Sequence, residues 1–191
     1  GGGGRRGGGG RGAVGGCTGR ADAGWGGGGT QAGWVVGGGG PGEKEGVRGE
    51  PFVGQAGQLR DNMLKAIGLS RTATGAKAVY IANVLKCRPP ANRNPQPGEM
   101  LQCEPYLQRQ VELLQPKIIL ALGRIAAQAL LSATVPDVAS TPLGKLRGQV
   151  HRYLGVPVVV SYHPAYLLRT PQDKAKAWID LCLALDVAGR T

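Results

Sequence analysis

The sequence predicts an α/β fold, a three-layer α/β/α sandwich built around a central four-stranded parallel sheet. Short runs of β-branched and apolar residues alternate along the chain with longer segments whose apolar residues recur at helical spacing. Strands and helices that alternate in this way form a parallel sheet with helices on both faces, because crossovers are right-handed. The 191 residues suffice for one such domain with its own core.

Four buried strands are expected, each a short apolar run that ends close to a glycine, proline or polar residue. In chain order they cover residues 34–37, 79–85, 117–122 and 156–160. Asn83 is the odd residue in the second run. A buried amide needs hydrogen-bond partners, which are either backbone groups or a ligand.

Apolar residues at helical spacing predict helices between and after the strands. The four sets are Leu59, Met63 and Ile67; Leu107, Val111 and Leu114; Ile125, Ala126, Ala129 and Leu130; Ala175, Trp178, Ile179, Cys182 and Leu185. We expect the last set, with Cys182, to face the core. Residues 133–149 are expected to form a loop. Its basic, glycine-containing part around Arg147 either follows a phosphate backbone or is a solvated connection.

Residues 1–33 are predicted to form a segment separate from a domain over residues 34–191. Of the 35 glycines, 25 lie in the first 50 residues, and such a density cannot offset its ordering entropy by burial. One interpretation is an arginine- and glycine-rich arm that contacts nucleic acid loosely. The other is out-of-frame translation of a GC-rich gene, because Gly, Arg, Ala and Trp have codons rich in G and C.

The net charge of +11 favours a polyanionic partner, nucleic acid above all, or else a basic surface kept for solubility. The first 40 residues carry +3 of this charge, so the remaining 151 residues carry +8. The sequence has no apolar run long enough for a membrane span and no secretory signal pattern. We therefore expect a cytoplasmic protein whose four cysteines are thiols or metal ligands.

Five motifs stand in order in the second part of the chain. They are Pro-Gly-Glu-x-Glu at 41–45, Pro-Phe-Val-Gly-x-Ala-Gly at 51–57, Asn-Val-x-Lys-Cys-Arg-Pro-Pro at 83–90, Ala-Leu-Gly at 121–123 and His-Pro-Ala-Tyr-Leu-Leu-Arg at 163–169. Over residues 41–188 the chain resembles the family 4 uracil-DNA glycosylases, which carry an iron–sulfur cluster. The resemblance implies an enzyme of base-excision repair. Such an enzyme flips deoxyuridine out of DNA and hydrolyses its N-glycosidic bond without a covalent intermediate.

The resemblance also implies which residues bind the base. Phe52 would stack on uracil, a contact worth about 1–3 kcal/mol per base. Asn83 would pair with N3–H and O4, a pattern that cytosine lacks, while Gly40 and Glu45 match further substrate-binding positions. His163 would donate a hydrogen bond to O2 of the leaving uracil, so His163 and Asn83 are the predicted catalytic residues. Each of these side chains also has a structural alternative: Phe52 and His163 as core residues, Asn83 as an amide bonded to backbone groups, and Glu45 as a solvated acid.

DNA contacts are implied as well. Leu167 and Leu168 would fill the gap left by the flipped base, unless they belong to the core. Arg169 would hold a phosphate, and Arg147 is a second candidate. The expected partner is therefore uracil-containing DNA, bound by a monomer.

The chain departs from the family pattern at one catalytic position. The family's first motif has a glutamate where this chain has Gly39. That glutamate would position the attacking water and stabilise the positive charge on the sugar. Glu43 is the nearest acid along the chain, but it lies beyond Pro41 and Gly42.

The cysteine pattern departs too. The family holds a [4Fe–4S] cluster with four cysteines, two in an early Cys-x-x-Cys and two later. Cys87 and Cys103 match the later pair, whereas Cys17 stands alone because Arg20 takes the place of its partner. The cluster is then absent, bound by three cysteines, or completed by an outside ligand.

Two alternatives to the enzyme stay open. The first is a uracil- or DNA-binding homologue without turnover, which would keep DNA affinity but show no excision. The second is a cluster-bearing, DNA-associated structural protein of the same fold. Its DNA binding would ignore uracil and would not change in an Asn83→Asp variant.

Overall fold

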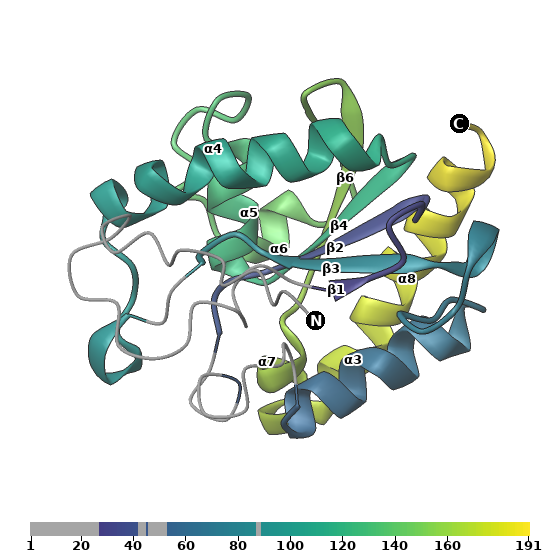
Figure 1. The fold of residues 1–191 in the computed structure, drawn as a ribbon. Coiled ribbons are helices and arrows are strands. Elements are labelled where there is room, and N and C mark those ends of the chain that lie inside the picture. The colour runs from purple at the N-terminus through teal and green to yellow at the C-terminus, as the bar shows by residue number, and fades with distance from the viewer. Residues whose placement is uncertain (1–26, 42–44, 46–52, 87–88) are drawn as a thin grey trace, which may run out of the picture.

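The computed structural model describes residues 27–41, 45, 53–86 and 89–191. Within these residues a six-stranded sheet has the order β1-β3-β2-β4-β6-β5 (Figure 1). Its strands are β1 (Gly27–Gly28), β2 (Trp34–Gly38), β3 (Val79–Asn83), β4 (Ile118–Leu122), β5 (Val150–Tyr153) and β6 (Val156–Ser161). The four central strands are parallel, as predicted, and the edge strands β1 and β5 pair antiparallel to their neighbours.

The sheet carries one hydrophobic cluster on each face, because successive side chains of a strand point in opposite directions. Val35 and Ile119 belong to one cluster. Val36 and Leu120, their immediate neighbours in β2 and β4, belong to the other. The continuous apolar runs recognised in the sequence are therefore strands buried on both faces.

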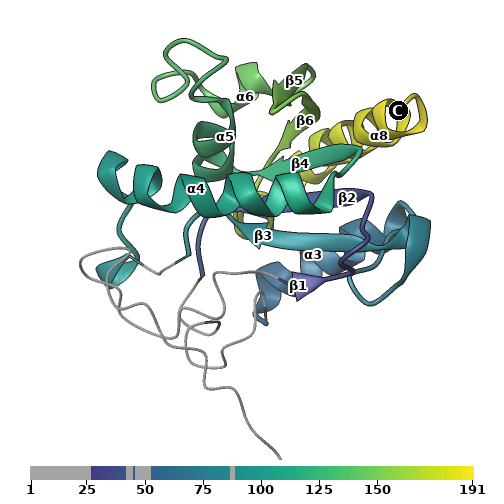
Figure 2. The same cartoon turned by 45° about the horizontal axis from the view of Figure 1, so that its top comes forward.

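Helices cover both faces of the sheet and complete the three predicted layers. In Figures 1 and 2, α4 (Pro97–Leu114) and α5 (Arg124–Leu131) lie on one side, and α3 (Gln55–Ala66) and α8 (Lys174–Gly189) lie on the other. Two short helices, α6 (Leu143–Leu146) and α7 (Pro164–Arg169), precede and follow the pair of strands β5 and β6. The described ranges also contain 3₁₀ turns at Gly75–Lys77, Pro90–Asn92 and Pro171–Asp173. No described helix is long and apolar enough to cross a membrane.

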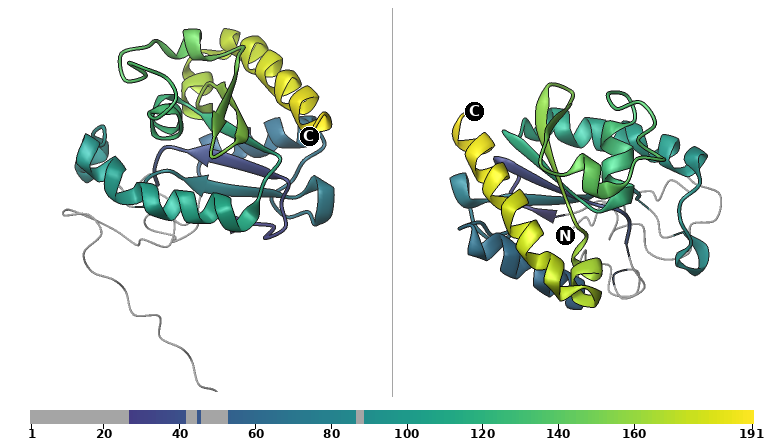
Figure 3. Two further views of the ribbon diagram at one scale, coloured as in Figure 1. Left: turned by 90° about the horizontal axis from the view of Figure 1, so that it is seen from above. Right: turned by 180° about the vertical axis from the view of Figure 1, so that it is seen from behind.

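Helix α8 faces the sheet with a different stripe from the predicted one. It crosses one face of the sheet (Figure 3, right), where Leu181 and Ala184 are buried. Trp178 and Ile179 are 47% and 63% exposed, and Cys182 is exposed as well, so the prediction that this stripe faces the core was wrong. The buried stripe also contains the charged Asp180, which hides it from a search for apolar periodicity.

The segment predicted as a loop over residues 133–149 contains α6, and β5 begins directly after it. Strand β5 has only Tyr153 fully buried, since it lies at the edge of the sheet. Its sequence, Val-His-Arg-Tyr, therefore lacks the apolar run by which the central strands were recognised.

Candidate active site at the carboxyl edge of the sheet

The chain reverses its direction of winding between β2 and β4. From β2 it passes through α3 to β3 on one side, and from β3 it returns through α4 to β4 on the other side. Open α/β sheets bind ligands in the crevice outside the carboxyl ends of the strands at such a reversal. Here these ends are Gly38 and Leu122.

A cavity of ≈ 380 Å³ lies at this position, a volume typical of small-molecule sites. Segments that follow β2, β4 and β6 line it, together with the loop before α4. The lining residues are Gly39, Gly40, Asn94, Pro95, Leu122, Gly123, Arg124, Ile125, Gln128 and His163. The structure therefore brings two of the predicted site residues, Gly40 and His163, to one cavity.

Backbone hydrogen bonds fix the segments that line the cavity. The N–H of Leu85 donates to the carbonyl of Gly39 at 2.8 Å, so pairing of β2 with β3 continues beyond both strands. The N–H of Gly123 donates to the carbonyl of Ser161 at 2.9 Å and continues the pairing of β4 with β6. The cavity wall thus rests on the sheet itself rather than on free loops.

Gly123 lets the histidine approach the end of β4. Its φ of +90° favours glycine, and a Cβ at this position would lie 2.9 Å from Cβ of His163. Any side chain here would displace the imidazole. The Ala-Leu-Gly motif at the end of β4 therefore has a steric reason that involves the β6–α7 turn.

His163 is the N-cap of α7, and this role fixes its tautomer. Its Nδ1 accepts a hydrogen bond from the N–H of Ala165 at 3.0 Å. In the neutral ring the proton then sits on Nε2, which donates to no residue in the part of the chain that the structure describes and can donate to a ligand. Burial, with added repulsion from Arg60 and Arg169, lowers the pKa of His163 below its ordinary value of 6.5. His163 is therefore a neutral hydrogen-bond donor near pH 7.

Two strands, β2 and β4, lie between the strand that ends at Asn83 and the strand that leads to His163. Asn83 is fully buried at the end of β3, opposite Gly38 of β2. Strands β3 and β6 are separated by β2 and β4, which puts their ends about 14 Å apart at the usual spacing of about 4.8 Å. Asn83 is not among the residues that line the cavity with His163.

Of two further predicted substrate contacts, Glu45 is among the described residues and Phe52 is not. Glu45 is half-buried, and its negative charge opposes the lowering of the pKa of His163. Glu45 thus lies within electrostatic range of the candidate site. Phe52 lies outside the described residues, as does Glu43.

Two buried cations near the site were missed by sequence reasoning. Lys86 donates through Nζ to the backbone carbonyl of Asn83 at 2.7 Å and to Oε1 of Gln110 at 2.6 Å. Burial lowers the pKa of Lys86 to about 8. Arg60, 2% exposed, lines a small cavity that also contacts His163. The signal for Arg60 was its position one helical turn before the core residue Leu64.

The predicted DNA-contacting residues divide into two groups. Leu168 is 41% exposed and Arg169 is also exposed, so both are available to a partner. Leu167 is 1% exposed, because it shares the buried face of α7 with Pro164, and it belongs to the core. Arg147 is 12% exposed, and its guanidinium pairs with the buried carboxylate of Asp180 in α8.

Of the predicted cluster ligands, only Cys103 is described. It is 1% exposed, and its Sγ accepts a hydrogen bond from the N–H of Lys86 at 3.5 Å. Cys17 and Cys87 lie outside the described residues. In the part of the chain that the structure does describe, no three His, Cys, Asp or Glu side chains gather as a metal site.

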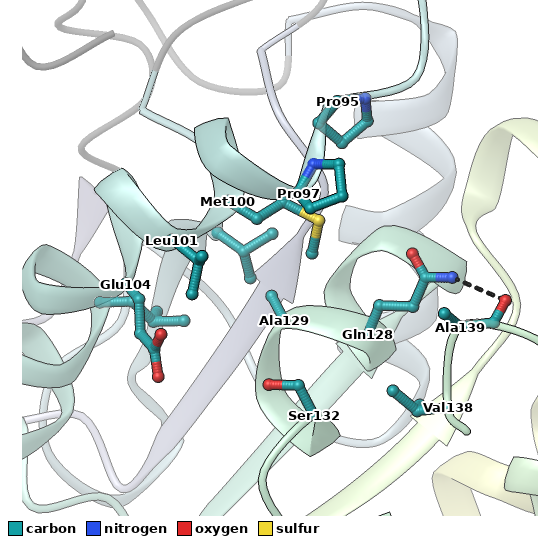
Figure 4. Close-up of a pocket in the computed structure, with 12 residues that line it drawn as sticks. Pro95, Pro97, Met100, Leu101, Glu104, Gln128, Ala129, Ser132, Val138 and Ala139 are labelled. Atoms are coloured by element: carbon teal, nitrogen blue, oxygen red, sulfur yellow. Dashed lines mark hydrogen bonds between the residues drawn. The ribbon is translucent and has the colours of Figure 1, made fainter. Parts of the chain in front are cut away.

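A second pocket of ≈ 310 Å³ lies beside the cavity, between α4, α5 and the loop after α5 (Figure 4). The two share Pro95 and Gln128. Gln128 donates through Nε2 to the carbonyl of Ala139 at 3.3 Å and closes the wall between α5 and this loop. Apart from Glu104, the residues that line this second pocket are uncharged, so we assign no catalytic role to the pocket.

The fold and the site define the class of the protein: a doubly wound α/β domain with a ligand cavity and a neutral histidine at its switch point. The sequence profile of the Uracil DNA glycosylase superfamily matches residues 25–184, and the chain belongs to this superfamily. The match begins within the segment 1–33 that the sequence analysis set apart, where β1 also lies.

Named relatives narrow the likeness. The chain is 45% identical over 136 residues to the type-4 uracil-DNA glycosylase of Archaeoglobus fulgidus. The aligned region covers 69% of this chain and 65% of that protein. The chain is 43% identical over 136 residues to the type-4 enzyme of Sulfurisphaera tokodaii, with 69% and 59% covered. It is 41% identical over 138 residues to the type-4 enzyme of Thermotoga maritima, and the aligned region covers 72% of this chain and 67% of that protein. The chain thus spans less than two thirds of the length of the first two of these relatives.

Proposed function

We propose that the chain removes uracil from DNA by hydrolysing the N-glycosidic bond of deoxyuridine, as a step of base-excision repair. The observation that carries this proposal is His163, a half-buried neutral imidazole beside a cavity at the switch point, whose Nε2–H meets no acceptor among the described residues. The type-4 glycosylases to which the chain is similar supply the substrate class.

In the proposed reaction the bond between C1′ of the sugar and N1 of uracil breaks, and its electron pair leaves with the base. The oxygen of a water molecule bonds to C1′, and the proton that this water loses passes through solvent to the uracil anion, which leaves as neutral uracil. Nε2–H of His163 donates to O2 of the uracil anion, where a preorganised donor stabilises the transition state by about 3–4 kcal/mol. Because the imidazole is neutral, it stabilises this anion by hydrogen bonding and does not need to transfer a proton.

Recognition of the base is assigned to Asn83, whose amide accepts from N3–H and donates to O4. Glu45, Gly40 and Phe52 are proposed as further contacts on the base. Leu168 and Arg169 are proposed to contact the DNA strand, because both are exposed directly after the site. The partner is thus uracil-containing DNA, and we propose that a monomer suffices.

Single-turnover excision from a uracil-containing oligonucleotide tests this function. We expect release of uracil, and a loss of about 10²–10³-fold in rate in a His163→Ala variant. Asn83→Asp should shift the preference from uracil toward cytosine, since a carboxylate reverses part of the donor pattern. Unchanged uracil selectivity in that variant would contradict the assignment.

A second candidate function is uracil-DNA binding without turnover. Gly39 lines the cavity where the family 4 resemblance places a glutamate, so the position carries no acid to orient water. Under this alternative, uracil-containing DNA binds more tightly than its thymine counterpart, but no base is released. Comparing dissociation constants with excision rates on the same oligonucleotides separates the two functions.

We also propose a [4Fe–4S] cluster held by Cys17, Cys87 and Cys103 with a fourth ligand from outside this set. Cys103 fits a ligand role, because its sulfur is buried and already accepts a hydrogen bond from the N–H of Lys86, the kind of outer contact that surrounds ligand sulfurs. The set is one cysteine short of the family pattern, and no step of the proposed hydrolysis passes through the cluster. Iron and sulfide analysis of anaerobically purified protein, with Cys103→Ala as control, tests it.

A further inference from the structure

A buried carboxylate of α8 faces the end of β6. Asp180 is 1% exposed. Its Oδ2 accepts hydrogen bonds from Oγ of Ser161 and from Nε of Arg147, both at 2.7 Å, and its Oδ1 accepts from Nη2 of Arg147 at 3.0 Å. Burying an unpaired carboxylate costs free energy, and these donors offset that cost and hold the Asp180 carboxylate in one position. One of its donors, Ser161, stands two residues before His163.

Arg147 extends this contact to the residue next to the histidine. Its Cζ lies 4.5 Å from the centroid of the Tyr162 ring, in a cation–π arrangement. Its Nη2 also donates to the backbone carbonyl of Lys176 in α8 at 2.8 Å. The guanidinium therefore ties α8 to Tyr162 at the point where the chain leaves β6.

The chain is held on the other side of His163 as well. The ring of Tyr162 stacks on that of Tyr166, with centroids 4.9 Å apart. The hydroxyl of Tyr166 donates to Oδ2 of Asp173 at 2.6 Å, and its N–H donates to the carbonyl of His163 at 2.9 Å. Contacts that start at Asp180 thus run through the residues on both sides of His163.

We infer that Arg147 and Asp180 are positioning residues that hold His163 against the cavity and set the direction of its Nε2–H. The inference rests on the proposed function, in which that N–H acts on the leaving base. Neither residue lines the cavity, so each acts through the histidine. A displacement of about 1 Å of a reacting group can cost about 10²-fold in rate, which makes such a support consequential.

A double-mutant cycle tests the inference. Arg147→Met should lower the single-turnover excision rate by about 10–100-fold and leave the dissociation constant for DNA unchanged. In a His163→Ala background the same change should have no further effect, because its only route to the reaction is gone. Equal losses in both backgrounds would overturn the inference.

The cycle also separates positioning from phosphate binding. A lost phosphate contact would reduce the slope of log affinity against log salt by about one. We expect Arg147→Met to leave this slope unchanged. Arg190→Met is the matched control, because Arg190 also pairs with an aspartate of α8, Asp186, but is 77% exposed. A reduced slope in Arg147→Met alone would overturn the positioning role.

A readout independent of excision keeps the two proposals apart. Nitrogen NMR of the imidazole should show the Nε2–H tautomer of His163 in the unchanged chain and a tautomer mixture in Arg147→Met. If the chain releases no uracil, the proposed function fails, but this spectrum still decides the positioning role. Ser161→Ala removes only one hydroxyl from Asp180 and should give a smaller shift in the same direction, even where Arg147→Met unfolds. Identical spectra in all three proteins would overturn the inference.

Discussion

At the scale of single residues, protonation of the neutral imidazole of His163 makes the free energy of unfolding depend on pH. The folded state lowers the pKa of His163, first by burial and then through Arg60 and Arg169, so the unfolded chain binds this proton more readily. The free energy of unfolding should therefore fall as the pH drops below the ordinary value of about 6.5, until the folded pKa is passed. His163→Asn cannot titrate, so its unfolding free energy should fall less over the same window. Urea denaturation at several pH values measures this difference, and parallel curves would contradict it.

A glutamate at position 39, which would match the family pattern, fits only if the side chain of Ile125 moves. A Cβ at Gly39 would lie 3.3 Å from Cβ and 3.5 Å from Cδ1 of Ile125. Gly39→Glu alone should therefore cost about 1–3 kcal/mol in overpacking, which urea denaturation measures. Adding Ile125→Ala should recover part of this stability and give the faster uracil excision of the two variants. Excision that is no faster in the double variant than in the unchanged chain would speak against an acid at this position.

At the scale of secondary-structure elements, the turn after β4 supports the turn after β6. Gly123→Ala would strain a backbone at φ +90° and push a methyl group to 2.9 Å from Cβ of His163. We expect a stability loss of about 1–3 kcal/mol and an excision loss of at least about 10-fold. Gly155→Ala is the matched control, since Gly155 has φ +79° but open space around its Cβ position. It should lose stability and keep its excision rate; equal excision losses would refute the steric link.

Helix α8 shows why one element could be placed but not oriented from the sequence. Its apolar residues predict a helix correctly, but two of its stripes are apolar enough to face a core. The stripe that does so contains Asp180. Its burial depends on Arg147 and Ser161, which lie 33 and 19 residues away along the chain. No local pattern contains that information.

The orientation of α8 gives a direct prediction. Leu181 is 2% exposed, whereas Ile179, two residues before it, is 63% exposed. Leu181→Ala should lower the free energy of unfolding by about 2–5 kcal/mol, because it leaves a cavity between α8 and the sheet. Ile179→Ala should change it by no more than about 0.5 kcal/mol. Chemical denaturation of the two variants tests this, and the reverse order would restore the orientation first expected from the sequence.

At the scale of the whole molecule, the parts predicted from sequence are those that burial alone decides. The four central strands were found because both of their faces are covered, and His163 because it follows such a strand. Gly39 was singled out by the resemblance to the family 4 enzymes. The edge strands and the support by Arg147 were not found. They depend on partners distant in the chain, and β5 has only Tyr153 buried. The part of the candidate site at the ends of the strands is thus predictable from the sequence. The contacts of Arg147 with α8 are not.

The charge of the whole chain leads to a last prediction. A net charge of +11 should make DNA affinity fall steeply with salt, with a slope of about −0.9 for each phosphate contact in duplex DNA. Arg169→Gln and Arg190→Gln remove the same charge, but Arg169 follows the candidate site and Arg190 follows the far end of α8, about 24 Å of helix away. If the sheet edge that carries His163 faces DNA, Arg169→Gln should reduce the salt slope by about 0.9, and Arg190→Gln should leave it unchanged. Fluorescence anisotropy over a salt series measures both slopes. An equal effect of the two variants would mean that the charge acts only in sum, and that DNA does not dock at this edge.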